Sequence, residues 1–192
     1  MPDARFDREE HEAAAALFEK GDYGRALDRY RELAERGSTY AQVFLGWMYH
    51  VGRGVEKDPD EAHRWYQRAA DADSADGQFY LGILQWEKEN YRAAVEWLEK
   101  AASRGHLPAL VRLGDLYLVG AGVGVDRERA YRLFEEAARG GHLVAQREIA
   151  VRMIKGELGV MRIPQGLYAL ARALWRVARL ASKDPQNEKL RH

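Results

Sequence analysis

The sequence of 192 residues contains no cysteine, and this absence excludes several chemistries at once. A chain without cysteine has no disulfides, no thiolate metal ligands and no cysteine nucleophile. Such a chain is also compatible with a reducing compartment. Neither positive nor negative charge is in excess, since Lys+Arg and Asp+Glu total 30 each. This balance argues against a dedicated nucleic-acid-binding protein, whose affinity depends mainly on neutralised phosphates.

Long apolar runs are absent from the sequence. No stretch approaches the ~20 consecutive apolar residues that a membrane-spanning helix needs. The chain begins MPDARFDREE, which is acidic, whereas a secretory signal needs a basic start followed by an apolar segment. These features predict a cytoplasmic protein.

Catalytic and metal-binding motifs are missing as well. The six histidines do not form an HExxH or another metal-ligand spacing, and no GxSxG nucleophile motif occurs. The glycine-rich stretch at 120–124 would need a preceding strand to form a dinucleotide site, so we interpret it as a structural loop. The sequence therefore predicts neither an enzyme nor a cofactor.

The strongest positive signal is an internal repeat. Leu45-Gly46 recurs after steps of 36 and 32 residues, and a weaker copy follows after another 36. The recurring pairs are Leu45-Gly46, Leu81-Gly82, Leu113-Gly114 and Ile149-Ala150. Two further alanine-based markers move in step with them. A repeat of this length is typical of helical solenoids.

Each repeat is predicted to contain two helices. In the second repeat Ala41, Leu45 and Met48 form one apolar stripe at helical spacing. The next helix is expected to begin at Asp58-Pro59, because Asp caps helices and Pro favours the first helical position. A glycine that recurs at one helical register indicates close helix packing, since glycine otherwise costs a helix ~1 kcal/mol.

A divergent first repeat is expected before residue 38. Asp22-Tyr23 lies 68 residues before Asn90-Tyr91, the offset that steps of 36 and 32 give together. Its helices are predicted at residues 8–20 and 23–36.

Two segments carry a resemblance to a known family. Residues 49–66, YHVGRGVEKDPDEAHRWY, and residues 117–130, YLVGAGVGVDRERA, resemble the Sel1-like subgroup of tetratricopeptide repeats, with its pattern Y-x-x-G-x-G-V-x-x-D-x-x-x-A. The repeat that begins near Gly77 lacks the loop glycines and is similar to an ordinary tetratricopeptide unit. The resemblance implies an all-α, right-handed superhelical solenoid of antiparallel helix pairs. It also implies an adaptor or scaffold function.

One solenoid domain is predicted over residues 1–192, because isolated helix pairs bury too little apolar surface to be stable. The expected repeats are 8–37, 38–73, 74–105, 106–141 and 142–163, followed by a capping helix at 164–183 and a tail at 184–192.

The resemblance implies that the first helix of each repeat lines a concave surface. The positions expected there are unusually apolar and aromatic, and exposed patches of this kind commonly mark binding sites. The predicted partner-binding residues are Tyr40, Val43, Trp47, His50, Phe79, Ile83, Trp86, Val111 and Asp115, with Phe18 from the first repeat. The alternative is that curvature of the solenoid buries several of these side chains.

The capping helix is predicted to be amphipathic. Its apolar face is expected to dock on the last repeat, and its basic face consists of Arg172, Arg176, Arg179 and Lys183. In the simpler interpretation the basic face is only solvated. In the alternative it binds an acidic partner or an anionic lipid surface.

The sequence therefore favours a cytoplasmic, bacterial adaptor that binds a peptide or helix of another protein in its concave groove. The same groove would serve an immunity-type protein that binds a toxin or effector. Peripheral membrane association through the last helix is a second hypothesis. Some relatives of this family are linked to cell-wall chemistry, but no motif in this chain supports an enzymatic role.

Overall fold

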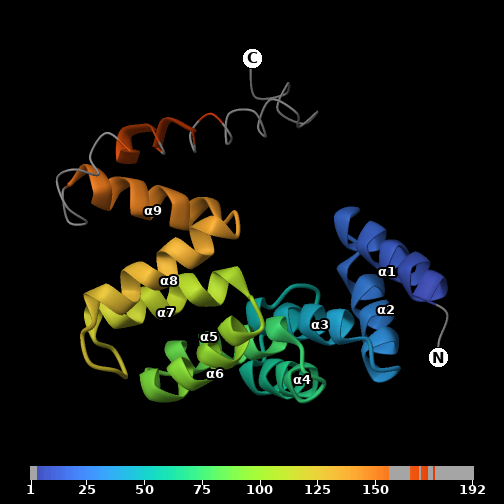
Figure 1. Cartoon of the computed structure of the whole chain (residues 1–192). Helices are drawn as coiled ribbons and strands as arrows, with labels where there is room; N and C mark the ends of the chain where they lie inside the picture. Colours follow the sequence, from blue (N-terminus) through green and yellow to red (C-terminus); the bar gives the residue numbers. More distant parts are fainter. Residues whose placement is uncertain (1–3, 156–164, 169, 173–174, 176–192) are drawn as a thin grey trace. The chain divides into compact units, whose positions relative to one another are not determined.

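The computed structural model describes residues 4–155, 165–168, 170–172 and 175 (Figure 1). Over these residues the regular structure is helical throughout, without a β-strand. The helices are α1 (Ala4–Glu19), α2 (Tyr23–Glu35), α3 (Thr39–Val51), α4 (Pro59–Asp71), α5 (Ala75–Glu87), α6 (Tyr91–Ser103), α7 (Leu107–Val119), α8 (Arg127–Arg139) and α9 (Leu143–Ile154). The prediction of consecutive helix pairs is confirmed.

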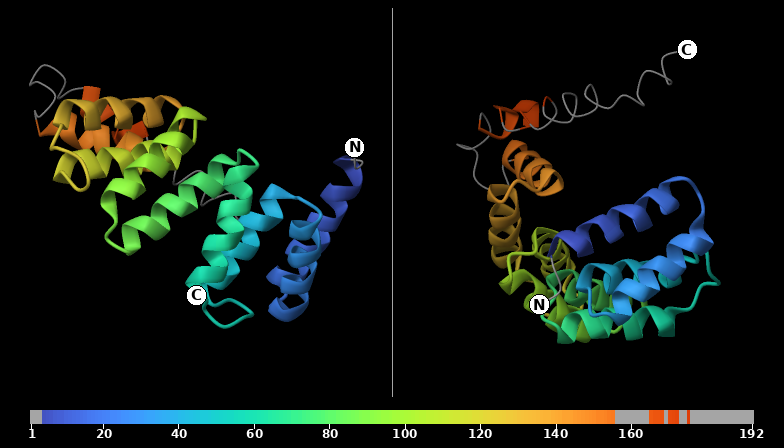
Figure 2. Two further views of the ribbon diagram at one scale, coloured as in Figure 1. Left: turned by 90° about the horizontal axis from the view of Figure 1, so that it is seen from below. Right: turned by 90° about the vertical axis from the view of Figure 1, so that its right-hand side faces the viewer.

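The chain divides into two compact units. Unit 1 comprises Met1–Ala109 and Ala121–Val123, and it contains α1 to α6 with the start of α7. Unit 2 comprises Leu110–Gly120 and Gly124–His192, and it contains the rest of α7 with α8 and α9. Within unit 1 each helix from α1 to α6 packs against the next one in the chain (Figure 2).

Side-chain caps fix where the helices begin. The Asp58 carboxylate accepts hydrogen bonds from the backbone N–H groups of Asp60 and Glu61 at 3.0 and 2.9 Å, and Pro59 opens α4. Asp126 caps α8 in the same way, through the N–H of Arg129 at 2.9 Å. These contacts confirm the helix start expected at Asp58-Pro59. Each cap stabilises its helix by about 1 kcal/mol.

The core repeats with the sequence. One large side chain from the second helix of each pair is fully buried, and in the second, third and fourth pairs it packs on a glycine of the first helix. These large residues are Tyr30, Tyr66, Leu98 and Phe134, spaced by 36, 32 and 36 residues. A Cβ added to Gly46 would lie 2.7 Å from the Tyr66 ring, and one added to Gly114 would lie 2.8 Å from the Phe134 ring. The close approach predicted from the recurring glycine is confirmed.

Gly77 supplies a test of this packing, because its register is occupied by buried alanines in the neighbouring repeats (Ala41, Ala109 and Ala145). The sequence alone would suggest Gly77→Ala as a stabilising change worth up to ~1 kcal/mol. In the structure, however, that Cβ would lie 2.7 Å from the backbone nitrogen of Ala70. We expect Gly77→Ala to lower the free energy of unfolding by about 1–2 kcal/mol, measured by urea unfolding. A stabilised variant would contradict the packing described.

The long loops of the second and fourth repeats each pack on an earlier helix start. Gly54 has a φ of +78°, and a Cβ there would lie 2.9 Å from the carbonyl oxygen of Tyr23, the first residue of α2. Gly122, with a φ of +73°, approaches the backbone of Tyr91, the first residue of α6. The glycine-rich stretch between α7 and α8 is therefore a packing loop, as expected.

Candidate functional site

A hollow of about 550 Å³ opens in unit 1 between α1, α3 and the start of α5. Half of its lining residues are aromatic, and the others are small, aliphatic or acidic. The lining residues are Ala15, Phe18, Glu19, Tyr30, Thr39, Tyr40, Val43, Phe44, Trp47, Ser74, Asp76 and Tyr80. We call this feature the aromatic hollow.

Helix α3 contributes more lining residues than any other helix, because it is apolar on two faces. Ala41, Leu45 and Met48 are completely buried in the core, as their spacing predicts. A second stripe, Tyr40, Val43, Phe44 and Trp47, follows the same helical spacing and lines the hollow. Tyr40 remains 57% exposed, so this stripe is only partly covered by the chain itself.

The rings of the aromatic hollow hold one another in place. The ring centre of Phe44 lies 4.2 Å from that of Tyr30, 5.2 Å from that of Phe18 and 5.4 Å from that of Trp47. Separations in this range are favourable for aromatic pairs, which add about 0.5–1.5 kcal/mol each beyond burial. The hollow is therefore preformed in the free protein.

Two tyrosines of the lining, the buried Tyr30 and the half-buried Tyr80, have raised pKa values. The hydroxyl of Tyr30 is buried and makes no well-formed hydrogen bond within the described residues. Burial, the neighbouring Tyr40 and the carboxylate of Glu19 raise the pKa of Tyr30 above its ordinary value. Burial and the carboxylate of Asp76 likewise raise the pKa of Tyr80. A carboxylate therefore lies near each of these two tyrosines, Glu19 near Tyr30 and Asp76 near Tyr80.

Four of the partner-binding residues predicted from sequence line the aromatic hollow: Phe18, Tyr40, Val43 and Trp47. His50 instead lies against α5, where its Nε2 is 2.8 Å from a carboxylate oxygen of Glu87. Phe79 packs on the imidazole of His106, with ring centres 4.6 Å apart.

Other predicted residues lie elsewhere. Ile83 is half-buried in α5, while Trp86 near the end of that helix is 44% exposed and lies outside the hollow lining. Val111 and Asp115 belong to α7 in unit 2. Partial desolvation raises the pKa of Asp115, and Glu148 adds to the effect while Arg112 opposes it.

The predicted basic face of the last helix is described at one position only. Arg172 is exposed and lines a smaller hollow of unit 2 with Arg139 and Tyr168. Arg176, Arg179 and Lys183 lie outside the described residues.

Three aromatic lining residues, Phe44, Tyr80 and Tyr30, were not predicted from the sequence, and neither were the two acidic ones, Glu19 and Asp76. Phe44 and Tyr80 occupy equivalent positions, 36 residues apart, and Phe44 falls four residues after Tyr40 on the same stripe. This spacing was the available signal for both. Tyr30 gave no comparable signal, because it comes from the second helix of its repeat and reaches the hollow through the core.

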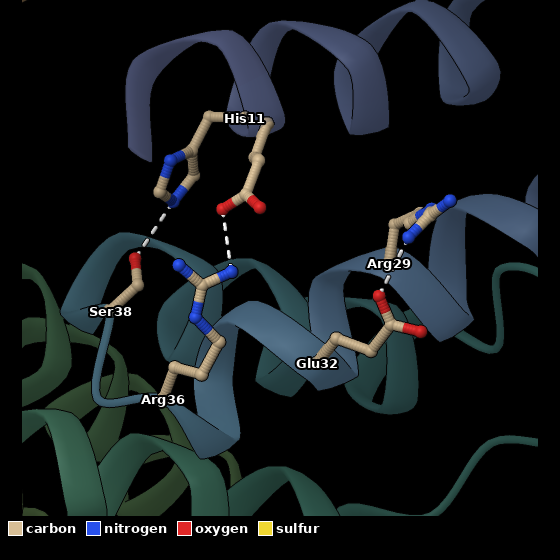
Figure 3. Close-up of polar contacts among 6 residues, drawn as sticks. His11, Arg29, Glu32, Arg36 and Ser38 are labelled. Carbon is tan, nitrogen blue, oxygen red and sulfur yellow. Dashed lines mark hydrogen bonds and ion pairs between the residues drawn. The ribbon is translucent and has the colours of Figure 1, made fainter. Parts of the chain in front are cut away.

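A second hollow of about 360 Å³ lies between α1 and α2 and is lined by charged side chains. Near it, His11 faces Ser38 (Figure 3), and the His11 Nε2 and Ser38 Oγ atoms are 2.8 Å apart. Arg36 donates a hydrogen bond of 2.6 Å to the carboxylate of Glu10. Ser38 also accepts the N–H of Ala41 as the cap of α3. The histidine–serine pair therefore joins α1 to the start of α3, which is a structural contact.

Two general features complete the site description. Within residues 4–155 and the described positions beyond them, no group of three or more His, Asp or Glu residues is placed to hold a metal ion. Among the same residues no helix is both long and apolar enough to cross a membrane.

Comparison with known families agrees with the repeat geometry. The Sel1 repeat family model matches residues 39–74, 75–106 and 107–142, which is more than half of the chain. The chain belongs to the Sel1 repeat family. Proteins of this family generally act as scaffolds for protein–protein interactions.

Solved Sel1 repeat structures resemble this chain over most of its length. A Sel1 repeat protein from Oxalobacter formigenes is 30% identical, with a TM-score of 0.65 over 75% of this chain and 61% of the other. The immunity protein Pa5087 from Pseudomonas aeruginosa is also 30% identical, with a TM-score of 0.65 over 87% of this chain and 64% of the other.

Curated relatives of this Sel1 repeat chain are much longer proteins. Chitin synthase regulatory factor 3 of Schizosaccharomyces pombe is 26% identical over an alignment of 194 residues, gaps included, that covers 96% of this chain and 20% of that protein. Chitin synthase regulatory factor 4 of the same yeast is 33% identical over 105 residues, or 51% of this chain and 17% of that protein. The chain thus spans about a fifth of these relatives.

Proposed function

We propose that this Sel1 repeat protein is a non-catalytic adaptor that holds a peptide segment or helix of a partner protein in the aromatic hollow of unit 1. The single observation that carries the proposal is the preformed aromatic hollow, which leaves Tyr40 more than half exposed. Large aromatic side chains are frequent energetic anchors of protein interfaces. A rigid site also loses little conformational freedom on binding.

Tyr40 is the residue best suited to a test. Trp47 and Phe44 pack against the core, so alanine at either position would change stability together with binding. We expect Tyr40→Ala to weaken binding of peptides, selected from a random library on the wild-type protein, by about 2 kcal/mol or roughly 30-fold. Affinity is measured by isothermal titration calorimetry, and circular dichroism checks that the helices remain.

Trp86→Ala provides the matched control. Trp86 is an exposed aromatic of similar size in the same unit, 44% exposed, but it does not line the aromatic hollow. We expect this variant to keep wild-type affinity. Equal losses in both variants, or no loss with Tyr40→Ala, would show that the selected peptides bind elsewhere and that the proposal is wrong.

A second candidate is an immunity-type role, in which the partner is a toxin or effector. The observation that favours it is the similarity to the Pseudomonas aeruginosa structure described as an immunity protein. We expect co-expression with a toxin from a neighbouring gene to restore growth of the host cell. A toxin that remains fully active in the presence of this protein would dismiss the candidate.

A further inference from the structure

The aromatic rings of this protein fall into two groups, those that the chain covers with its own cations and those that it does not. Outside the aromatic hollow, the chain places its own cations over several rings: Arg53 lies 4.8 Å from the ring centre of Tyr23, and Lys100 lies 4.0 Å from that of Trp97. Arg68 covers Trp65 at 4.7 Å in the same manner. In unit 2, Arg129 covers Tyr117 at 4.3 Å.

The rings of the aromatic hollow have no such cover. Within the described part of the chain, no lysine or arginine lies over any of its six rings, and no basic residue belongs to its lining. These rings are Phe18, Tyr30, Tyr40, Phe44, Trp47 and Tyr80. The face of an aromatic ring is electrostatically negative and attracts cations. The hollow therefore leaves room for a cation over an aromatic ring, a contact that the chain makes with its own side chains elsewhere.

Carboxylates reinforce this preference. The lining contains two charged residues, Glu19 at the end of α1 and Asp76 in the first turn of α5, and both are acidic. Asp76 contacts His106, with 3.1 Å between Oδ1 and Nε2. Glu19 is exposed and makes no ion pair with any described residue. Burial is the main cause of the raised pKa of both tyrosines, to which Tyr40 and then Glu19 add at Tyr30 and Asp76 adds at Tyr80.

We infer that the aromatic hollow binds a cationic side chain, an arginine or a lysine, presented by the partner segment. This inference rests on the proposed function and specifies the chemistry of the partner. The alkyl stem of such a side chain packs on the rings, its charged group lies over a ring face, and Glu19 supplies the counter-charge. Arginine suits the site particularly well, because its planar guanidinium stacks on aromatic faces and also pairs with carboxylates.

The test uses peptides selected from a random library on the full-length wild-type protein. We expect the selected peptides to share an arginine or lysine. Replacing that arginine by citrulline, which has nearly the same shape but no charge, is expected to weaken binding roughly tenfold. For a lysine peptide, the acetylated lysine serves the same purpose. The Glu19→Gln variant is expected to weaken binding of the charged peptide about fivefold and to leave binding of the neutral peptide unchanged.

Glu12→Gln is the matched control. Glu12 is an exposed glutamate of the same helix that pairs with Arg8 at 3.0 Å and does not line the hollow, so this variant should bind both peptides as the wild type does. Selected peptides that are neutral, or citrulline peptides that bind as well as arginine peptides, would overturn the inference. If such peptides still lose affinity with Tyr40→Ala, the proposed function stands. If Tyr40→Ala has no effect, the proposed function itself fails.

Discussion

Replacing Phe134 by alanine is expected to lower the free energy of unfolding of this Sel1 repeat protein by about 3–5 kcal/mol. The Phe134 side chain is completely buried in unit 2, and its ring fills the space directly opposite Gly114. Because the opposing residue has no side chain, α7 cannot fill the cavity that the substitution would leave. Thermal unfolding followed by circular dichroism should show a Tm lower by roughly 2–4 °C for each kcal/mol lost.

The chain itself supplies the control for this prediction. Leu98 occupies the equivalent position in the preceding repeat and is also buried, opposite Gly82. Phe134→Leu should therefore cost less than about 1.5 kcal/mol, as conservative hydrophobic exchanges usually do. Similar losses for the alanine and leucine variants would mean that the position tolerates no change of shape. In that case the equivalence of the repeats would not extend to their packing.

The second large effect is expected for Gly122→Ala. Gly122 has a φ of +73°, a left-handed conformation that costs an alanine about 1–2 kcal/mol. Its added Cβ would also lie 2.6 Å from the backbone nitrogen of Arg92, which cannot move without shifting the start of α6. Overpacking of this kind costs about 1–3 kcal/mol. We expect a total loss of roughly 3 kcal/mol in urea unfolding.

Gly124 lies two residues further along the same loop and provides the comparison. A Cβ added there would meet nothing within 4 Å, and Gly124 is not among the residues with a positive φ. Gly124→Ala should change the free energy of unfolding by no more than about 0.5 kcal/mol. A tolerant Gly122, or a sensitive Gly124, would mean that the loop does not pack on α6 as described.

Much of the fold could be predicted from the sequence, because the same packing problem recurs every 32 or 36 residues. Residues at the repeated helix contact therefore recur at the same spacing in the sequence, as Leu45 and Gly46 do. Helix starts were predictable because a cap is a local interaction: Asp58 accepts a hydrogen bond from the backbone of Glu61, only three residues away. Gly77 shows the limit: its register predicts an alanine, and only the backbone of the adjacent α4 explains why glycine stands there.

The site was only partly predictable, because exposure depends on which neighbouring helix covers each face. His50 and Phe79 fit the same helical pattern as residues of the aromatic hollow, yet each contacts a residue of the following repeat. His50 contacts Glu87, and Phe79 contacts His106. Tyr30 contributes from the opposite direction, through the core. Periodicity identifies a face of a helix, but it does not show what lies against that face.

The packing of each glycine loop on a tyrosine limits how repeats can be inserted into or deleted from this chain. Gly54 and Gly122 are 68 residues apart, as are their contacts Tyr23 and Tyr91, so a short repeat and the following long repeat form one interdependent block. Duplicating a single long repeat would place its loop over Pro59 instead of the tyrosine whose backbone it contacts at both present positions. Viable insertions and deletions in this chain are therefore expected to come in pairs of repeats.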